Sequence, residues 1–197
     1  SLNEEKTKSL DNLKQEINSI KNCKLKDNAD YLGFGYGNIS SSLMIISGTP
    51  SKKNNENNKS FSEENSLLLK KMLLAINIKK ENIYSTYAVN YQTPNDRKPT
   101  TDEINKYSNF LKKHIAIINP KIIILMGSTA MEALTGLNNK ISIERGKWKE
   151  VIVKNTNYNV IITFSSSYLL RFPENKKYAW EDLKKIKKKI TDLNLNI

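Results

Sequence analysis

Three short turns of small, hydroxyl-bearing residues are the parts of this sequence best suited to chemistry. They are Ser47–Ser51, Gly127–Thr129 and Ser165–Ser167. Each follows a run of apolar residues typical of a buried strand, so each is expected at the carboxyl end of a strand, where parallel sheets bind ligands. Hydroxyls and backbone N–H groups at such turns bind anions, although helix capping is the simpler role for Ser165–Ser167.

The chain has few cysteine and histidine residues, and this excludes several classes of metal site and catalytic site. The 197 residues include one cysteine, Cys23, and one histidine, His114. A single thiol cannot close an internal disulfide or by itself hold zinc or an iron–sulfur cluster, and a single histidine excludes most zinc and Ser-His-Asp schemes. We therefore expect no metal and no cofactor, with Cys23 as a small buried hydrophobe and His114 as a helix residue without catalytic work.

The net charge of +12 comes from 32 Lys and Arg residues against 20 Asp and Glu residues. Such a balance suits a polyanion, because displacing counterions from phosphates gives affinity that does not depend on sequence. DNA is the first candidate partner, and no protein partner can be named. The lysines of Lys184–Lys189 fit a solvated helix face better than a phosphate-binding stripe. No apolar run approaches the ~20 residues that cross a bilayer and no signal segment follows Ser1, so a cytoplasmic protein without membrane contact is expected.

Hydrophobic periodicity and turn residues predict the elements that carry these turns. Thr100 and Glu103 form a capping-box signature, and the helix that they begin is the firmest prediction. Strand, small-residue turn and helix recur three times, which indicates a parallel sheet with helices on both faces. The expected helices cover about 2–22, 62–76, 101–118, 128–134 and 177–190, and the expected strands cover 43–46, 83–89, 121–126, 148–153 and 160–164.

Two segments fit none of these elements. Gly33, Gly35 and Gly37 alternate with aromatic residues. No strand precedes them and no helix follows, so a dinucleotide-binding loop is disfavoured. The polar stretch 52–59 is of low complexity and is expected to be a mobile surface loop.

Five further segments, taken together, resemble the uracil-DNA glycosylase superfamily, and most closely its bacterial iron–sulfur branch. All three arginines of the chain lie in them. The resemblance extends from about residue 10 to 190, and five segments in one order and spacing make it specific. The segments are Pro94–Pro99, Glu103–Ile104, Asn119–Ile123, Arg145–Trp148 and Tyr168–Arg171.

The resemblance implies an α/β fold, a three-layer α/β/α sandwich with a central four-stranded, mainly parallel sheet. Residues 1–197 would form one domain, with an amino-terminal helix in 1–25 packed on it. A base would swing out of DNA into a pocket at one edge of the sheet. By resemblance, the base pocket would comprise Ser47, Thr49, Pro50, Phe61 and Tyr87, and the DNA contacts would come from Arg97, Ser128, Ser166, Ser167, Leu169 and Arg171.

Three positions depart from the family pattern in ways that remove ionisable or base-reading groups. Gly48 stands where the family has a water-orienting carboxylate, and Tyr87 stands where an asparagine reads the base. Ser165 replaces a histidine that supports the departing uracil. Losing one such stabilising group typically costs on the order of a hundred- to a thousandfold in rate, and here three change together.

The family's four cluster cysteines fall at Ile20, Cys23, Tyr91 and Tyr107, so one thiol remains. The replacements are bulky and largely apolar, as filling the volume of a cluster would require. Of the pocket aromatics, Phe61 is near the family's base-stacking ring, although simple packing is its plainer role.

Three functions stay open at this point. The leading hypothesis is a degenerate uracil-DNA glycosylase-like protein that retains DNA binding in a repair-related role but turns over little or no uracil, so an enzymatic activity is uncertain and disfavoured. A second is an active glycosylase with altered base specificity that uses the hydroxyls of Ser47, Thr49 and Ser165. A third is a protein-interaction module without DNA contact.

Overall fold

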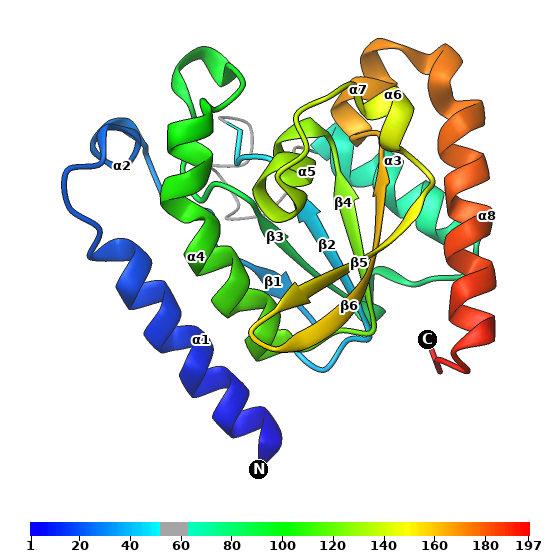
Figure 1. Cartoon of the computed structure of the whole chain (residues 1–197), viewed down its shortest axis with the longest axis horizontal. Helices are drawn as coiled ribbons and strands as arrows, with labels where there is room; N and C mark the ends of the chain where they lie inside the picture. Colours follow the sequence, from blue (N-terminus) through cyan, green and yellow to red (C-terminus); the bar gives the residue numbers. More distant parts are fainter. Residues whose placement is uncertain (52–62) are drawn as a thin grey trace.

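The computed structural model describes residues 1–51 and 63–197, with the side chain of residue 63 left out. The expected loop at 52–59 and the candidate pocket residue Phe61 lie outside the described residues. Figure 1 shows a central sheet with its carboxyl edge at the top and both termini toward the bottom. No helix among the described residues is both long enough and apolar enough to cross a bilayer.

The sheet has six strands in the order β1-β3-β2-β4-β6-β5. Its four inner strands, β3, β2, β4 and β6, are parallel, whereas β1 and β5 pair antiparallel at the two edges. The expected four-stranded parallel sheet is thus present, and two edge strands raise the count to six. The strands are β1 (Tyr36–Gly37), β2 (Leu43–Ser47), β3 (Ile83–Tyr87), β4 (Ile122–Met126), β5 (Trp148–Val153) and β6 (Thr156–Thr163).

Helices cover both faces of this sheet, which confirms the α/β class. The α-helices are α1 (Leu2–Asn18), α2 (Lys24–Asn28), α3 (Glu63–Ala75), α4 (Thr101–Ile118), α5 (Ser128–Thr135), α6 (Ile141–Glu144), α7 (Ser166–Arg171) and α8 (Lys176–Asp192). The inner strands alternate between the two cores, so that Met44 faces the side of α4 and α5 while Ile45 faces α3 and α8. Both faces are apolar because helices bury both.

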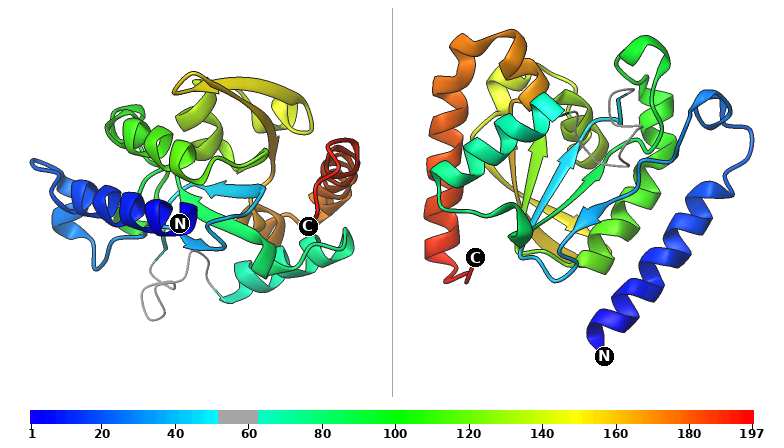
Figure 2. Two further views of the ribbon diagram at one scale, coloured as in Figure 1. Left: turned by 90° about the horizontal axis from the view of Figure 1, so that it is seen from below. Right: turned by 180° about the vertical axis from the view of Figure 1, so that it is seen from behind.

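The amino-terminal helix α1 lies outermost, against α4 (Figures 1 and 2). Leu10, Leu13 and Ile17 form its buried stripe. The helix ends at Asn18 rather than near residue 22, and the following Asn22 adopts a left-handed conformation that no helix continues. Lys6 Nζ donates to the carbonyl oxygen of Ile118, 2.9 Å away, and so fastens α1 to the end of α4.

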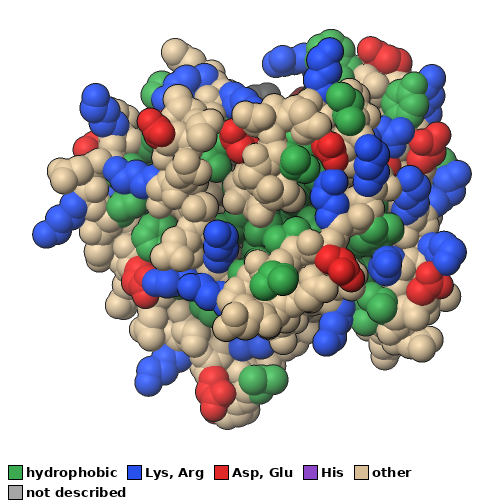
Figure 3. Space-filling view, viewed as in Figure 1, with side chains coloured by type: hydrophobic (Ala, Val, Ile, Leu, Met, Phe, Trp, Pro, Cys, Tyr) green, Lys and Arg blue, Asp and Glu red, His purple; other side chains and the backbone are tan. Residues whose placement is uncertain are grey.

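Basic side chains are spread over the face shown in Figure 3 and gather over α8. Lys185 Nζ donates to the carbonyl of Gly146 at 2.9 Å, Lys188 pairs with Asp192, and Lys189 lies over the ring of Trp148. These lysines are engaged with the protein itself, which disfavours a phosphate-binding stripe along α8.

Candidate functional site

A cleft of about 860 Å³ opens at the carboxyl edge of the sheet. It is bounded by the ends of β2 and β3, the starts of α5 and α7, and the loop that precedes α4. All three hydroxyl-rich turns of the sequence meet there, as expected from their places after parallel strands. The lining residues include Ser47, Gly48, Thr49, Tyr87, Arg97, Lys98, Ser128, Thr129, Ser165, Ser166, Ser167, Tyr168, Leu170 and Arg171.

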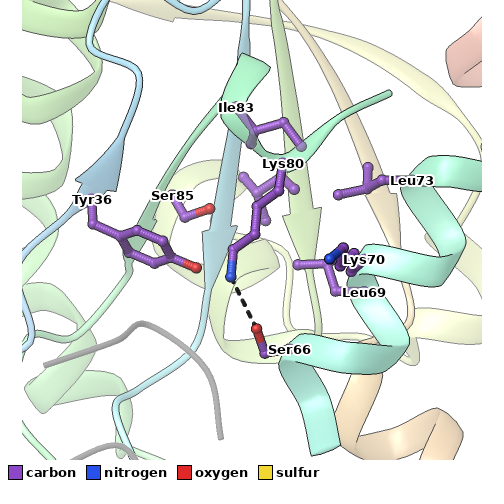
Figure 4. Close-up of a pocket in the computed structure, with 9 residues that line it drawn as sticks. Tyr36, Ser66, Leu69, Lys70, Leu73, Lys80, Ile83 and Ser85 are labelled. Carbon is purple, nitrogen blue, oxygen red and sulfur yellow. Dashed lines mark hydrogen bonds between the residues drawn. The ribbon is translucent and has the colours of Figure 1, made fainter. Parts of the chain in front are cut away.

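A second cavity, between α3 and β3, is far smaller (Figure 4). It holds about 10 Å³, room for roughly one water molecule, and Lys80 Nζ spans it to reach Ser66 Oγ at 3.1 Å. Tyr36 and Ser85 point toward it from β1 and β3. Its size leaves no room for a base or a cofactor, so the cleft is the better candidate site.

The turn after β2 is held by backbone hydrogen bonds that continue the sheet. The amide of Ala88 donates to Ser47 O at 2.8 Å, and that of Val89 donates to Gly48 O at 3.0 Å. Gly48 packs closely on α5, because a β-carbon placed on it would lie 3.3 Å from Thr129 Cβ. Gly48, which the sequence resemblance matched to the family's carboxylate, thus has no side chain and is closely approached by a threonine.

Tyr87 ends β3 beside Ser47 and is buried, yet its side chain lines the cleft. The loop at Gly33 packs against the ring of Tyr87. A β-carbon on Gly33 would lie 3.0 Å from Tyr87 Cε2 and 2.3 Å from Pro50 Cγ, so glycine is required there for close approach. Pro50 is buried under this loop and is not among the residues that line the cleft.

The glycine repeat therefore has a packing role. Asn90 locks the Gly33 loop from both sides, with its Nδ2 donating to Gly33 O at 3.0 Å and its carbonyl accepting from Gly33 N at 2.8 Å. A β-carbon on Gly35 would collide with the hydroxyl of Tyr84 and would lie 3.0 Å from His114 Cε1. These two glycines let the loop lie directly on β3 and α4.

His114 lies in the core and does not line the cleft. Its Nε2 is 2.6 Å from Tyr84 Oη, its Nδ1 is 3.4 Å from Thr86 Oγ1, and Phe34 stacks on the ring. Burial lowers the pKa of His114 to about 3, so the imidazole is neutral at physiological pH. Its role is structural, as a satisfied core histidine.

Ser165 caps α7, as predicted. Its Oγ accepts from the amide of Tyr168 at 3.2 Å and lies 3.2 Å from Ser167 Oγ. Ser128 and Ser166, the first residues of α5 and α7, both line the cleft. The partial positive charge of two helix amino termini therefore faces the cavity.

Charged side chains of both signs line the cleft. Arg97, Lys98 and Arg171 lie there together with the carboxylates of Glu64 and Asp96. Neither acid was a candidate from the sequence, because single acidic residues in a lysine-rich chain give no signal of a site.

Two hydrogen bonds hold the guanidinium of Arg97 on Glu103. Its Nη1 and Nη2 donate to the two carboxylate oxygens of Glu103 at 2.7 and 3.1 Å. Glu103 also accepts from the amide of Thr100 at 2.9 Å and so completes the predicted capping box of α4. Because Arg97 donates to it, the pKa of Glu103 is lowered below its ordinary value.

The third arginine, Arg145, lies elsewhere and anchors α8. Its Nη1 donates to Asp182 Oδ1 at 2.7 Å, and its Nη2 donates to Glu181 at 3.2 Å. Asp182 is fully buried, and desolvation raises its pKa although Thr163 and Arg145 both donate to it. This family segment therefore supports the fold and not the cleft.

The predicted DNA contact at Leu169 is wrong, because its neighbour Leu170 lines the cleft and Leu169 does not. Leu169 has 0% of its surface exposed and packs with Phe164 and Ala179, so it cannot touch a strand in the cleft. Leu170 is 41% exposed and lines the cleft instead. In a helix as short as α7 the apolar pattern Leu169-Leu170 does not say which leucine faces inward.

The positions that the sequence resemblance matched to the family's cluster cysteines form part of the core between α1 and α4. Cys23 Sγ lies 2.8 Å from Tyr107 Oη, and the rings of Tyr91 and Tyr107 meet edge to face at 6.1 Å. Ile20 packs against the same core. Burial raises the pKa of both phenols, so they remain protonated.

These residues do not fit an iron–sulfur cluster, which takes four thiolates or, less often, thiolates with imidazoles. One thiol, two phenols and an alkyl group provide no such set. Across residues 1–51 and 63–197, no three or more His, Cys, Asp or Glu side chains gather as a metal site would require.

Comparison with known proteins identifies relatives along most of the chain. A family model described as the uracil DNA glycosylase superfamily matches residues 34–184. The type-4 uracil-DNA glycosylase of Archaeoglobus fulgidus is 28% identical over 183 residues, which cover 90% of this chain and 92% of that protein. The corresponding enzyme of Thermotoga maritima is 28% identical over 167 residues (84% and 86%), and that of Sulfurisphaera tokodaii is 28% identical over 184 residues (91% and 84%).

Proposed function

The chain belongs to the uracil DNA glycosylase superfamily, and we propose that it is a DNA-binding member of a repair-related kind with strongly impaired turnover of uracil. One observation carries the proposal: the cleft persists with its basic rim, while the three positions of the family's acid, base reader and histidine are Gly48, Tyr87 and Ser165. None of these three can carry a charge at neutral pH.

Cleavage of an N-glycosidic bond leaves positive charge on the sugar and negative charge on the base, so it needs groups that stabilise both and place a water. Gly48 offers no side chain, and Thr129 crowds the space beside it. Ser165 uses its oxygen to cap α7 and has only a hydroxyl proton to donate. Tyr87 is buried where a base would enter. The expected result is a scaffold that still receives a nucleotide but barely accelerates its cleavage.

DNA binding requires only hydrogen-bond donors and positive charge in the site, whereas catalysis also requires groups that stabilise the transition state. Arg97, Lys98 and Arg171 line the cleft, and the amino termini of α5 and α7 face it. Phosphate oxygens accept hydrogen bonds from such donors, and the net charge of +12 favours a polyanion at longer range. The guanidinium of Arg97 is already paired with both carboxylate oxygens of Glu103, so Arg171 is the better residue for testing a phosphate contact.

The first experiment measures DNA affinity and base release together. Fluorescence anisotropy with a single-stranded uracil-containing oligonucleotide, at 50 and 200 mM salt, gives Kd and its salt slope, and gel analysis of the same strand gives uracil release. We expect salt-sensitive binding without measurable release. Arg171→Ala should lower the salt slope by about 0.7, the value for one phosphate contact to a single strand. Lys154→Ala, in the exposed turn between β5 and β6, is the matched control and should leave the slope unchanged.

Two results would contradict the proposal. Efficient uracil release would show that turnover is not impaired. A slope near zero in log Kd against log salt would instead favour a protein-interaction module without DNA contact.

A second candidate function has one observation in its favour. Hydroxyls of Ser47, Thr49 and Ser165 line the cleft together with the carboxylates of Glu64 and Asp96, which are groups that can hold a water. An active glycosylase with altered base specificity would release another damaged base from a panel of lesion-containing strands. Asp96→Asn should abolish that release, and no release across the panel would exclude this function.

We further propose that the protein holds no iron–sulfur cluster. The contact of Cys23 with Tyr107, and of Tyr107 with Tyr91, supports this proposal because these side chains pack on one another at the former ligand positions. Protein purified without oxygen should be colourless, lack absorbance near 400 nm and contain no stoichiometric iron. Brown, iron-loaded protein would overturn it.

A further inference from the structure

Three aromatic rings form a column beside α7. Phe164 lies before the amino-terminal cap Ser165, Tyr168 lies within α7, and Phe172 is the residue at its carboxyl-terminal cap. The rings of Phe164 and Tyr168 are stacked with centroids 4.8 Å apart, and those of Tyr168 and Phe172 are 4.9 Å apart and tilted by 44°. The column thus continues through three rings in contact.

The column runs from the core to solvent. Phe164 is 3% exposed and packs in the small core with Leu169 and Ala179, which fixes the inner end. Tyr168 is 36% exposed and Phe172 is 39% exposed. One face of Tyr168 is already stacked on Phe164, so a flat ligand would meet the exposed parts of Tyr168 and Phe172 at the outer end of the column.

This surface adjoins the cleft. Tyr168 itself lines the cavity, and the two neighbouring residues Leu170 and Arg171 do so as well. Phe172 is not among the residues that line the cleft, so it would be met by a unit next to the one that the cleft holds. The basic side chains Arg97, Lys98 and Arg171 on the same rim match a ligand with negative charge between its flat groups.

Nucleic acid with unpaired bases has this chemistry, because flat bases alternate with phosphates. We infer that Tyr168 and Phe172 form a stacking platform for the bases beside the nucleotide in the cleft, so that the ligand is single-stranded DNA. This inference rests on the proposed DNA binding and specifies its form. Stacking on aromatic rings is tolerant of base identity, so the platform selects strand form and not sequence.

A duplex fits the surface less well. Its bases already stack on each other and present only edges in the grooves, so the faces of Tyr168 and Phe172 would meet no base face without unstacking the duplex. The platform consequently predicts tighter binding of a single strand than of the same sequence in a duplex.

The test compares three probes with the wild-type chain. They are a fluorescein-labelled 12-nucleotide oligodeoxythymidine, an abasic strand with the same number of phosphates, and the duplex of the first with oligodeoxyadenosine. Anisotropy at one fixed salt concentration should show the oligodeoxythymidine bound about tenfold or more tightly than the abasic strand, because each base that stacks on an aromatic ring adds affinity. The duplex should also bind more weakly.

Two alanine variants and two control variants test whether the bases stack on Tyr168 and Phe172. Tyr168→Ala and Phe172→Ala should each lower the affinity for oligodeoxythymidine by about fivefold or more and leave affinity for the abasic strand unchanged. Tyr168→Phe keeps the ring and should bind as the wild type does. Trp180→Ala removes another exposed aromatic, on α8, and should have no effect. Because the abasic strand reports on folding and phosphate contacts in the same variants, a misfolded protein would be recognised by loss of both affinities.

The outcomes separate this inference from the proposed function. Equal affinity for oligodeoxythymidine and the abasic strand would overturn the stacking platform but leave DNA binding in place. Equal losses in Tyr168→Ala and Trp180→Ala would overturn it as well, since unspecific apolar contact would then explain both. Absence of binding to all three probes would overturn both the platform and the proposed function.

Discussion

Two regions of this molecule, the interface between α1 and α4 and the carboxyl edge of the sheet, differ in how they are packed. Between α1 and α4, Cys23, Tyr91 and Tyr107 are all buried and in contact. At the carboxyl edge of the sheet, Gly48 and Ser165 line an open cleft of about 860 Å³. The interior is filled with side chains, whereas the cleft is hollow.

The difference follows from what each region contributes to stability. A void between two packed helices costs free energy in proportion to its volume, so the space between α1 and α4 must be filled for α1 to stay docked. A cleft open to solvent has no such cost, and under the proposed function its rim binds DNA.

The comparison would fail if the packed interior between α1 and α4 proved unimportant for stability. Tyr107→Ala should lower the free energy of unfolding by about 3–5 kcal/mol, because it leaves a cavity where a fully buried ring now packs. Tyr107→Phe keeps the ring, loses only the hydroxyl contact with Cys23, and should cost about 1 kcal/mol. Urea unfolding followed by circular dichroism measures both, and a loss below 1 kcal/mol in the alanine variant would contradict the argument.

A second, smaller effect concerns the pH dependence of the interior. His114 has a pKa of about 3 when folded, against 6.5 for a free histidine, so the unfolded chain binds a proton that the folded chain excludes. Stability should therefore fall as the pH is lowered from 6.5 to 4.5, by up to about 1.4 kcal/mol per pH unit from this residue. His114→Gln should flatten this part of the profile in urea unfolding, even if its absolute stability is lower. An unchanged slope would show that His114 is protonated in the folded chain.

The smallest expected change in stability is that of a substitution in the cleft. Arg171→Ala should change the free energy of unfolding by less than about 0.5 kcal/mol, as exposed substitutions usually do, while it weakens DNA binding. Thermal and urea unfolding beside the anisotropy measurement separate the two effects. A large loss of stability in Arg171→Ala would show that the cleft, like the interior, contributes to folding, and the two regions would then not differ in this respect.

Much of the fold was predictable because its signals are local. The apolar runs that became β2, β4 and β6 and the capping box at Thr100 and Glu103 each report on a few adjacent residues. The strand β1 escaped prediction because two residues, Tyr36 and Gly37, carry no periodicity.

The site was less predictable because it depends on contacts across the sheet. The closeness of Gly33 to Tyr87 and of Gly48 to Thr129 joins segments far apart in sequence. Burial of His114 did have a signal: it falls three residues after Leu111 and seven after Tyr107, on the apolar stripe of α4, although two lysines precede it. Both leucines of α7 fit its apolar pattern, so only packing distinguishes them.

The fastening of α1 bears on how a shortened chain would behave. The family match begins at residue 34, yet Leu10, Leu13 and Ile17 cover the outer side of α4, and Lys6 closes the carbonyl end of that helix. A fragment trimmed to the matched residues would present Tyr107 and Leu111 to water and leave the terminal carbonyls of α4 without their lysine. Such a fragment should self-associate, and any affinity measured with it would describe an aggregate instead of the cleft.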